Sequence, residues 1–150
     1  MTLIIADEPT AGLDVSVQGE ILNLFGRLQA ELGLSYMIIT HNLAVVRHVS
    51  DRTAIMYMGR IVEEGPTQAL FQAPRHPYAA ALLAAQPNTD PARRRSGPAL
   101  TGEVTSLRNR PSGCEFNPRC ARASEICRSR VPAAEVSAVS HIVRCHHPLG

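Results

Sequence analysis

The sequence contains no lysine, and all 15 of its basic residues are arginine. A phosphate-binding loop of the form G-x-x-x-x-G-K-[ST] requires a lysine, so this chain cannot contain one. Long apolar runs are also missing, because residues 3–6 and 37–39 fall far short of the roughly 20 residues that a membrane-spanning helix needs. The first residues lack the charged, apolar and cleavage regions of a signal peptide. We therefore expect a cytoplasmic protein.

Charge is divided unevenly along the chain. Residues 1–90 hold 5 Arg against 9 Asp and Glu, a net charge of −4, whereas residues 91–150 hold 10 Arg against 4 Glu, a net charge of +6. The change falls near residues 86–98, a stretch rich in proline and arginine that is typical of an exposed linker. Its arginine run, residues 93–95, fits a solvated linker better than a nucleic-acid or lipid-binding patch. The length of 150 residues allows one ordinary core plus an appendage.

The first forty residues alternate between strand-like and helix-like patterns. The apolar run Leu3 to Ala6 is followed by apolar residues from Val17 to Leu32 at helical spacing, which predicts a helix. Gly33 is placed to end this helix as its C-terminal cap. A second apolar run, Tyr36 to Thr40, is typical of a strand buried in a parallel sheet. The order strand, helix, strand predicts a βαβ unit and an α/β fold.

Chemically reactive side chains follow both expected strands. Asp7 and Glu8 come after the first strand, and His41 comes after the second. Parallel strands end at one edge of the sheet, where open α/β folds bind ligands, so we expect these side chains to meet. A carboxylate pair beside a histidine can hold Mg²⁺ and orient a water for attack on phosphate. Taken singly, such acids are often helix caps and such a histidine is a surface residue, so their order and spacing carry the interpretation.

Three segments resemble ATP-binding-cassette (ABC) ATPases. "LIIADEPTAGLD" (3–14) resembles the Walker B strand and D-loop, "MIITHN" (37–42) the switch-histidine strand, and "DRTAIMYMGRIVEEG" (51–65) the closing β-hairpin. The resemblance implies a truncated P-loop NTPase core, because the lysine-containing loop and an LSGGQ-type signature are both missing. It covers roughly the second half of such a subunit, so we expect either a fragment or a late start. This chain alone is predicted neither to bind ATP tightly nor to hydrolyse it.

The same resemblance implies a role for each site residue. Asp7 would bind Mg²⁺ through water, Glu8 would be the catalytic base, and His41 would contact the γ-phosphate of ATP. Asp14 would act across the interface between two ATPase subunits. Asp14 could equally cap the helix that begins near Val15.

The later part of the chain resembles the C-terminal extension of oligopeptide and dipeptide ABC importers. The similar segments are His-Pro-Tyr at 76–78 followed by a leucine pair, "GEVTSL" (102–107), "PSGCEFNPRC" (111–120) and "VRCHHP" (143–148). We accordingly expect half an ATPase domain in residues 1–72 and the extension in residues 73–150. Pro77 is placed at the first turn of a short helix that buries Leu82 and Leu83.

This resemblance implies a partial ATP-hydrolysing subunit that energises peptide import. Its partners would be a second ABC ATPase subunit, transmembrane permease subunits and, indirectly, an extracytoplasmic solute-binding protein, with no nucleic acid. The subunit would lie peripherally on the cytoplasmic face of the membrane. Import of another solute such as nickel, and a metal- or redox-sensing module built on an ATPase remnant, remain alternatives.

Four cysteines lie in the last 40 residues, with the spacing C-x5-C-x6-C-x17-C: Cys114, Cys120, Cys127 and Cys145. In a cytoplasmic chain such a set favours a metal site over disulfides. The spacing matches neither the C-x2-C pairs of zinc sites nor a common ferredoxin pattern, so the kind of metal stays open. Neighbouring arginines are expected to favour thiolates over thiols.

Resemblance to the importer extension adds a more specific expectation for the four cysteines. It implies a [4Fe-4S] cluster, with zinc as the alternative. His141, His146 and His147 could supply zinc ligands, although the histidines beside Pro148 are more typical of solvent-exposed residues.

Overall fold

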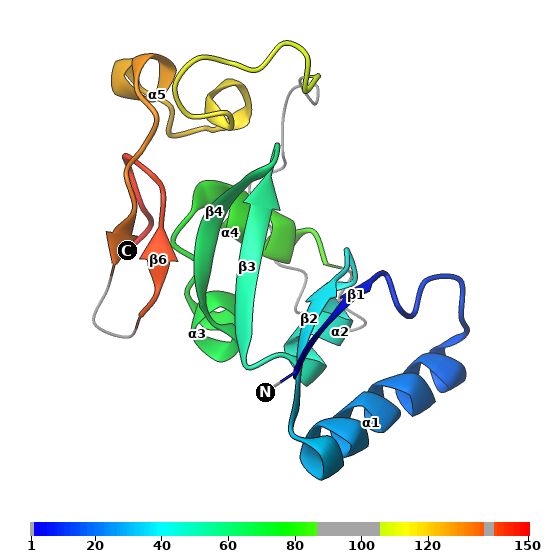
Figure 1. Cartoon of the computed structure of the whole chain (residues 1–150). Helices are drawn as coiled ribbons and strands as arrows, with labels where there is room; N and C mark the ends of the chain where they lie inside the picture. The colour runs from blue at the N-terminus through cyan, green and yellow to red at the C-terminus, as the bar shows by residue number, and fades with distance from the viewer. Residues whose placement is uncertain (1, 87–105, 137–139) are drawn as a thin grey trace, which may run out of the picture. The chain divides into compact units, whose positions relative to one another are not determined.

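The computed structural model describes residues 2–86, 106–136 and 140–150. These residues form a mixed α/β structure in two compact units, Met1–Ser50 and Asp51–Gly150 (Figure 1). The expected linker near residues 86–98, with its arginine run, lies almost entirely outside the described residues, and the boundary between residues 72 and 73 stays a prediction. In the described part of the chain, no helix has the length and apolar character needed to cross a bilayer.

The first unit contains the expected βαβ arrangement (Figure 1). Strand β1 (Thr2–Asp7) runs parallel to β2 (Leu34–Ile39), with helix α1 (Val15–Leu32) between them in the chain. A shorter helix, α2 (Leu43–Val49), follows β2. The parallel pairing confirms that both strands end at the same edge of the sheet.

Helix α1 begins and ends where the sequence predicts. The side chain of Asp14 accepts a hydrogen bond from the backbone N–H of Val17 at 3.0 Å. At the other end, Gly33 adopts a left-handed conformation, with φ of 63°, and its N–H donates to the carbonyl of Gln29. Both helix ends are therefore fixed by local hydrogen bonds.

One face of the β1–β2 sheet is apolar and uncovered among the described residues. The register pairs Ile5 with Met37 and Asp7 with Ile39, so these side chains share a face. Leu3, Ile5, Met37 and Ile39 are 59%, 63%, 52% and 46% exposed. Among the described residues of this unit, only Thr10 and Val45 are buried.

The second unit is built on the expected β-hairpin. Strands β3 (Arg52–Tyr57) and β4 (Arg60–Pro66) pair antiparallel. The two residues between them, Met58 and Gly59, both have positive φ, 48° and 80°. That combination defines a type I′ turn, whose twist matches that of the paired strands.

The C-terminal segment adds two short strands to this hairpin. Strand β6 (Ile142–Val143) pairs with β4, and β5 (Glu135–Val136) pairs with β6, giving the order β3-β4-β6-β5. Two backbone bonds extend the attachment, from Arg144 N–H to the Val62 carbonyl and from Leu149 N–H to the Arg75 carbonyl. Sequence patterns do not predict this pairing, because two-residue strands have no detectable periodicity.

Short helices surround an aromatic core in the second unit. They are α3 (Thr67–Gln72), α4 (Pro77–Ala84), the 3-10 helix η2 (Asn117–Arg119) and α5 (Glu125–Ser129). Rings of Tyr57, Tyr78 and Phe116 pack with centroid distances of 4.7 to 5.4 Å. Pro77 opens α4 as predicted, and of its leucine pair, Leu83 is buried and Leu82 is half-buried.

Candidate functional site

The ends of β1 and β2 bring Glu8 and His41 into direct contact. Nδ1 of His41 lies 2.6 Å from Oε1 of Glu8, and the same oxygen accepts the backbone N–H of His41 at 3.0 Å. The other carboxylate oxygen accepts the hydroxyl of Thr40 at 3.1 Å. The expected meeting of these two side chains is therefore confirmed, and Thr40 is a further contact that the sequence analysis missed.

Glu8 occupies an unusual backbone conformation. Its φ is 47°, in the left-handed region that a non-glycine residue adopts at a cost of about 1–2 kcal/mol. Its N–H donates to the Ile39 carbonyl at 2.8 Å, which continues the bonding of the β1–β2 pair past the end of β1. This turn directs the carboxylate toward residues 40 and 41.

Hydrogen bonding keeps Glu8 ionised. The side-chain hydrogen bond from His41 is the main cause that lowers the pKa of Glu8, helped by the His41 N–H and the Thr40 hydroxyl and opposed by partial burial. The side chain of His41 is 85% exposed. The result is a carboxylate held in a fixed orientation at a sheet edge that is open to solvent.

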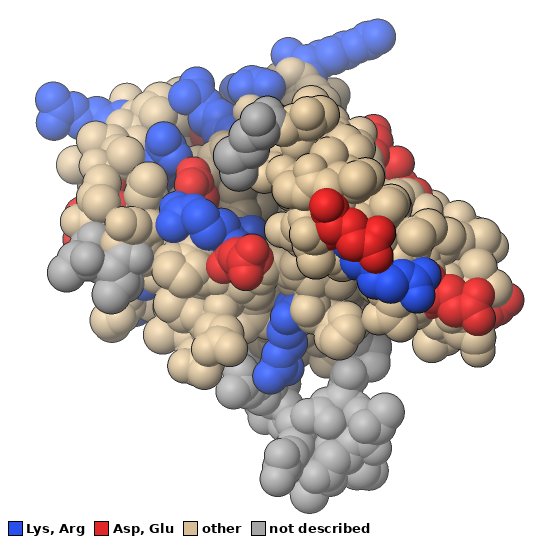
Figure 2. Space-filling model, turned by 60° about the horizontal axis from the view of Figure 1, so that its bottom comes forward, with Lys and Arg blue, Asp and Glu red and all other residues tan. Residues whose placement is uncertain are grey.

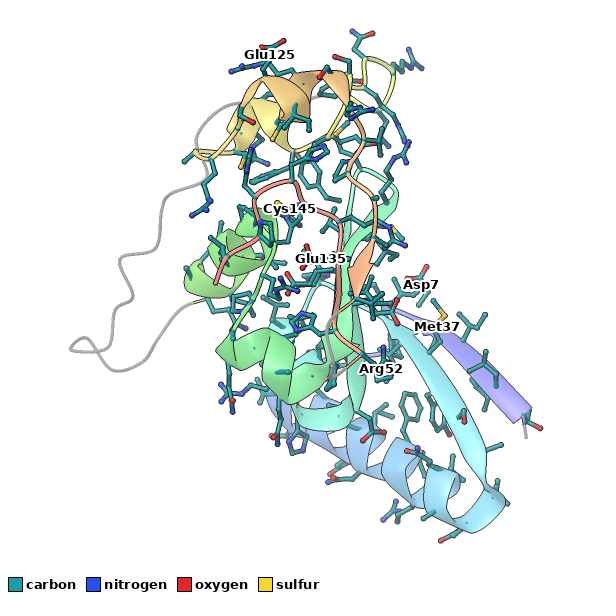
Figure 3. The ribbon with its side chains drawn as sticks, turned by 90° about the vertical axis from the view of Figure 1, so that its left-hand side faces the viewer. Asp7, Met37, Arg52, Glu125, Glu135 and Cys145 are labelled. Atoms are coloured by element: carbon teal, nitrogen blue, oxygen red, sulfur yellow. The ribbon has the colours of Figure 1, made fainter. Side chains whose placement is uncertain are left out.

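Asp7 and Asp14 lie on either side of Glu8 in the chain. Asp7 is exposed at the end of β1, where Figure 3 labels it. Asp14 serves as the N-cap of α1, which was the alternative left open by the sequence. Its role across a subunit interface stays a prediction.

The loop between Glu8 and Asp14 is held by a residue that the sequence analysis did not identify. Gln18 donates from Nε2 to the carbonyls of Thr10, at 3.2 Å, and Leu13, at 3.0 Å. Thr10 is 3% exposed. No sequence signal marks Gln18, because a glutamine on an exposed helix face is ordinary.

The four cysteines form a second candidate site, close enough that charge on one thiol affects the others. Burial raises the pKa of Cys114, Cys120 and Cys145, that of Cys145 to about 11, and negative charge on neighbouring cysteines raises each further. Figure 3 labels Cys145 just beyond β6. These three groups are therefore thiols at neutral pH.

The expectation that arginines make these groups thiolates is wrong. Arg122 is the one arginine among the groups that shift these three pKa values. It lowers the pKa of Cys120, but by less than burial raises it. Arg144 instead donates to the carbonyl of Ile61 at 3.1 Å, and Arg128 lies 3.7 Å from Glu125. Adjacency in sequence does not bring these guanidinium groups to the sulfurs.

Neighbouring thiols do not by themselves form a metal site. In residues 2–86, 106–136 and 140–150, no three Cys, His, Asp or Glu side chains are arranged to hold a metal ion. The histidines have other partners: His147 Nε2 lies 2.6 Å from the Ser124 hydroxyl, and His146 Nε2 lies 2.9 Å from the Arg130 carbonyl. His141 is buried, 4% exposed, and its ring contacts Glu63.

Ion pairs connect arginines of the hairpin and its following turn to carboxylates of the later chain. Arg60 pairs with Glu115, and Arg75 pairs with Glu135 at 3.0 Å. Figure 2 shows acidic and basic side chains next to one another at several places on one face. The Arg75–Glu135 pair is at the surface and contributes about 0–1 kcal/mol, whereas Glu115 is buried and Arg60 supplies a charge partner for it.

Comparison with known proteins shows similarity to peptide-transport ATP-binding proteins. Residues 62–127 match the family described as oligopeptide/dipeptide transporter, C-terminal region. A dipeptide transport ATP-binding protein of Haemophilus influenzae is 48% identical over 97% of this chain and 44% of its own length. A probable peptide ABC transporter ATP-binding protein of Sinorhizobium fredii is 52% identical over 97% of this chain and 41% of its own length.

An oligopeptide transport ATP-binding protein of Bacillus subtilis is 44% identical over 96% of this chain and 44% of its own length. The chain thus spans less than half the length of these curated relatives. The family match covers the hairpin strand β4, the His-Pro-Tyr segment and three of the four cysteines. Along nearly its whole length the chain is therefore similar to part of the ATP-binding proteins of oligopeptide and dipeptide transport, and residues 62–127 match the C-terminal region of that family.

Proposed function

We propose that this chain supplies the water-activating half of an ATP-binding subunit that energises peptide import. The contact between Glu8 and His41 is the observation that carries the proposal. This chain would form a truncated P-loop NTPase core, and the complete subunit would work with a second ATPase subunit. The subunit would lie at the cytoplasmic face of the membrane and bind transmembrane permease subunits. Through these permeases it would be coupled to an extracytoplasmic solute-binding protein.

Each residue has a role that its geometry supports. Glu8, ionised and held by three hydrogen bonds, accepts a hydrogen bond from the attacking water and orients it toward phosphorus. A carboxylate whose pKa is lowered is a weak base, so it orients the water more than it removes its proton. His41 is exposed enough to reach the γ-phosphate with its ring nitrogen.

The exposed carboxylate of Asp7 fits Mg²⁺, which keeps most of its water ligands and is often bound through one or two carboxylates. Bound there, Mg²⁺ would neutralise charge on the phosphates.

A chimera tests this assignment, with residues 1–150 replacing the matching part of the Haemophilus influenzae relative. We expect Glu8→Gln to lower phosphate release from ATP by about a hundredfold or more, because the orienting charge is lost. Glu20→Gln, the same change on the exposed face of α1, is the matched control. Equal rates in the two variants, with unchanged circular dichroism, would refute the role of Glu8.

The cysteines support a second proposal: Cys114, Cys120, Cys127 and Cys145 bind a [4Fe-4S] cluster, with zinc as the alternative. The mutual effect of the thiols on their pKa values supports it, because four sulfurs sharing one partly buried region suit a cation that displaces their protons. Iron or zinc would supply that charge. Binding requires the cysteines to move from their present positions into ligating geometry.

Anaerobic reconstitution of the full chain distinguishes the outcomes. Brown colour with broad visible absorption and about four irons per chain would support the cluster. Colourless protein with one zinc per chain would reject the cluster in favour of zinc. The variant Cys127→Ser should reduce the bound metal in either case, whereas equal metal content would show that the cysteines are not the ligands.

A further inference from the structure

Glu63, on β4, is a carboxylate with no exposure to solvent. A buried charge is costly unless hydrogen bonds satisfy it fully. Glu63 accepts three: from the backbone N–H of Arg75 at 2.7 Å, from the backbone N–H of His76 at 2.8 Å, and from Nε2 of His141 at 2.6 Å. It is therefore bonded to the turn before α4 and to the segment before β6.

The contact with His141 is built into the hairpin. His141 is 4% exposed, and its ring lies against Gly65 on the same strand as Glu63. A Cβ at residue 65 would lie 3.0 Å from two carbon atoms of this ring. The absence of a side chain at Gly65 thus leaves the space that the imidazole fills.

His141 immediately precedes the strand that leads to the fourth cysteine. Ile142 and Val143 pair with β4 at Glu64 and Glu63, and Arg144 N–H donates to the Val62 carbonyl. Cys145 is the next residue. Because the His141 contact fixes where this strand begins on β4, it also fixes where Cys145 lies.

We propose that Glu63 is the positioning residue of the cysteine site: by binding His141 it holds Cys145 beside Cys114, Cys120 and Cys127. The inference deepens the proposed cysteine centre and rests on it for the metal readout alone. Besides the backbone bonds of β6 and of residues 144 and 149, the segment has side-chain attachments at the surface, Arg75 to Glu135 and Arg52 to the Ser140 carbonyl, which contribute less than a buried charged bond. Figure 3 labels Glu135 and Cys145 on this segment and Arg52 on β3.

The test uses the full chain and a matched pair of variants. Glu63→Gln keeps the shape of the side chain but turns an N–H₂ group toward one of the three donors. Glu64→Gln makes the same change on the next residue, whose partner is the exposed Arg52. Amide hydrogen exchange is followed at Arg144 and Leu149, and alkylation of Cys145 by iodoacetamide is followed by mass spectrometry.

We expect Glu63→Gln to speed exchange at both amides and alkylation of Cys145 by about tenfold or more, since a lost charged hydrogen bond is worth that much in an opening equilibrium. Protection of β3 and β4 should persist, and Glu64→Gln should match the wild type. Unchanged exchange and alkylation in Glu63→Gln would overturn the proposal.

A second pair covers the case in which Glu63→Gln does not fold. His141→Ala removes the side-chain donor while both backbone donors to Glu63 remain, and should release the segment in the same way. His141→Gln can donate from a similar position and should restore slow alkylation of Cys145. Equal alkylation in His141→Ala and the wild type would contradict the inference.

Metal content separates this inference from the metal proposal. If reconstituted wild type binds no metal but Glu63→Gln still exposes Cys145, the metal centre fails and the positioning role stands. If wild type binds metal and Glu63→Gln binds the same amount with Cys145 equally protected from alkylation, the positioning role fails and the centre stands.

Discussion

His76 shows how one buried side chain makes stability depend on pH. It is 1% exposed, and its Nδ1 accepts the N–H of Tyr78, which caps α4. The neutral ring therefore carries its proton on Nε2, which has no hydrogen-bond partner among the described residues. Burial lowers the pKa of His76 from 6.5 to about 4, because a charged ring would lose its hydration.

This lowered pKa predicts a loss of stability in mild acid. Between pH 6.5 and about 4 the unfolded chain takes up a proton at His76 that the folded chain does not, so the free energy of unfolding falls as pH falls. The fall from this residue is about 2–3 kcal/mol across the window. His76→Asn keeps a cap acceptor without titrating, so urea unfolding at pH 7 and pH 4.5 should show a smaller change. An equal change in both proteins would contradict the prediction.

For single residues, the sequence predicted the side chains that belong to a local motif. It did not predict contacts between residues far apart in the chain. Glu8 and His41 were predictable because each follows a strand. Glu63 and His141 lie 78 positions apart, and no local pattern pairs them. The pKa of Cys145 was also unpredictable, because it depends on burial and not on the neighbouring Arg144.

At the scale of elements, the β1–β2 sheet leaves apolar side chains exposed to solvent. Its apolar face presents Leu3, Ile5, Met37 and Ile39 to solvent in the described structure. Exposed apolar strands promote association between chains. We expect Leu3→Thr with Ile5→Thr to lower the amount of aggregate of the purified chain several-fold in light scattering, because both changes keep strand propensity and remove apolar surface. Val15→Thr on α1 is the control, and an equal decrease there would argue against a role for the sheet face.

The hairpin turn makes an independent prediction. Gly59 has φ of 80°, which an alanine adopts only with strain, so Gly59→Ala should destabilise the second unit by about 1 kcal/mol. Gly19→Ala, inside α1 where the added Cβ meets nothing within 4 Å, should instead stabilise its helix by about 0.5–1 kcal/mol. Thermal unfolding followed by circular dichroism measures both. A neutral result for Gly59→Ala would show that the turn is not limiting.

The longer helices and strands were more predictable from sequence than the short strands that pair with the hairpin. The helix with its Asp14 and Gly33 caps and the parallel strand pair follow from spacing and capping residues, whereas the hairpin was expected from the resemblance to ABC ATPases. The strands β5 and β6 do not, because two residues are too few to show a period. They form where Glu63 and the neighbouring backbone of β4 provide hydrogen-bond partners.

For the whole molecule, the absence of lysine leads to a functional prediction. The sequence has Glu8 and His41, to which we assign the orientation of water and contact with phosphate, but it cannot contain the lysine of a G-x-x-x-x-G-K-[ST] loop that reaches the β- and γ-phosphates. We expect the purified 150-residue chain to release no phosphate from ATP above the buffer rate, with or without a metal chelator. Chelator-sensitive hydrolysis that disappears in Glu8→Gln would contradict this expectation.

The left-handed backbone at Glu8 implies a trade-off between durability and activity. Glycine is the residue that adopts φ of 47° without penalty, so Glu8→Gly would relax this turn while removing the carboxylate. The same replacement would remove the three hydrogen bonds that the carboxylate makes with Thr40 and His41, so backbone strain is set against side-chain bonding at this residue. Glutamate here therefore holds backbone strain at the very residue to which we assign the orientation of water.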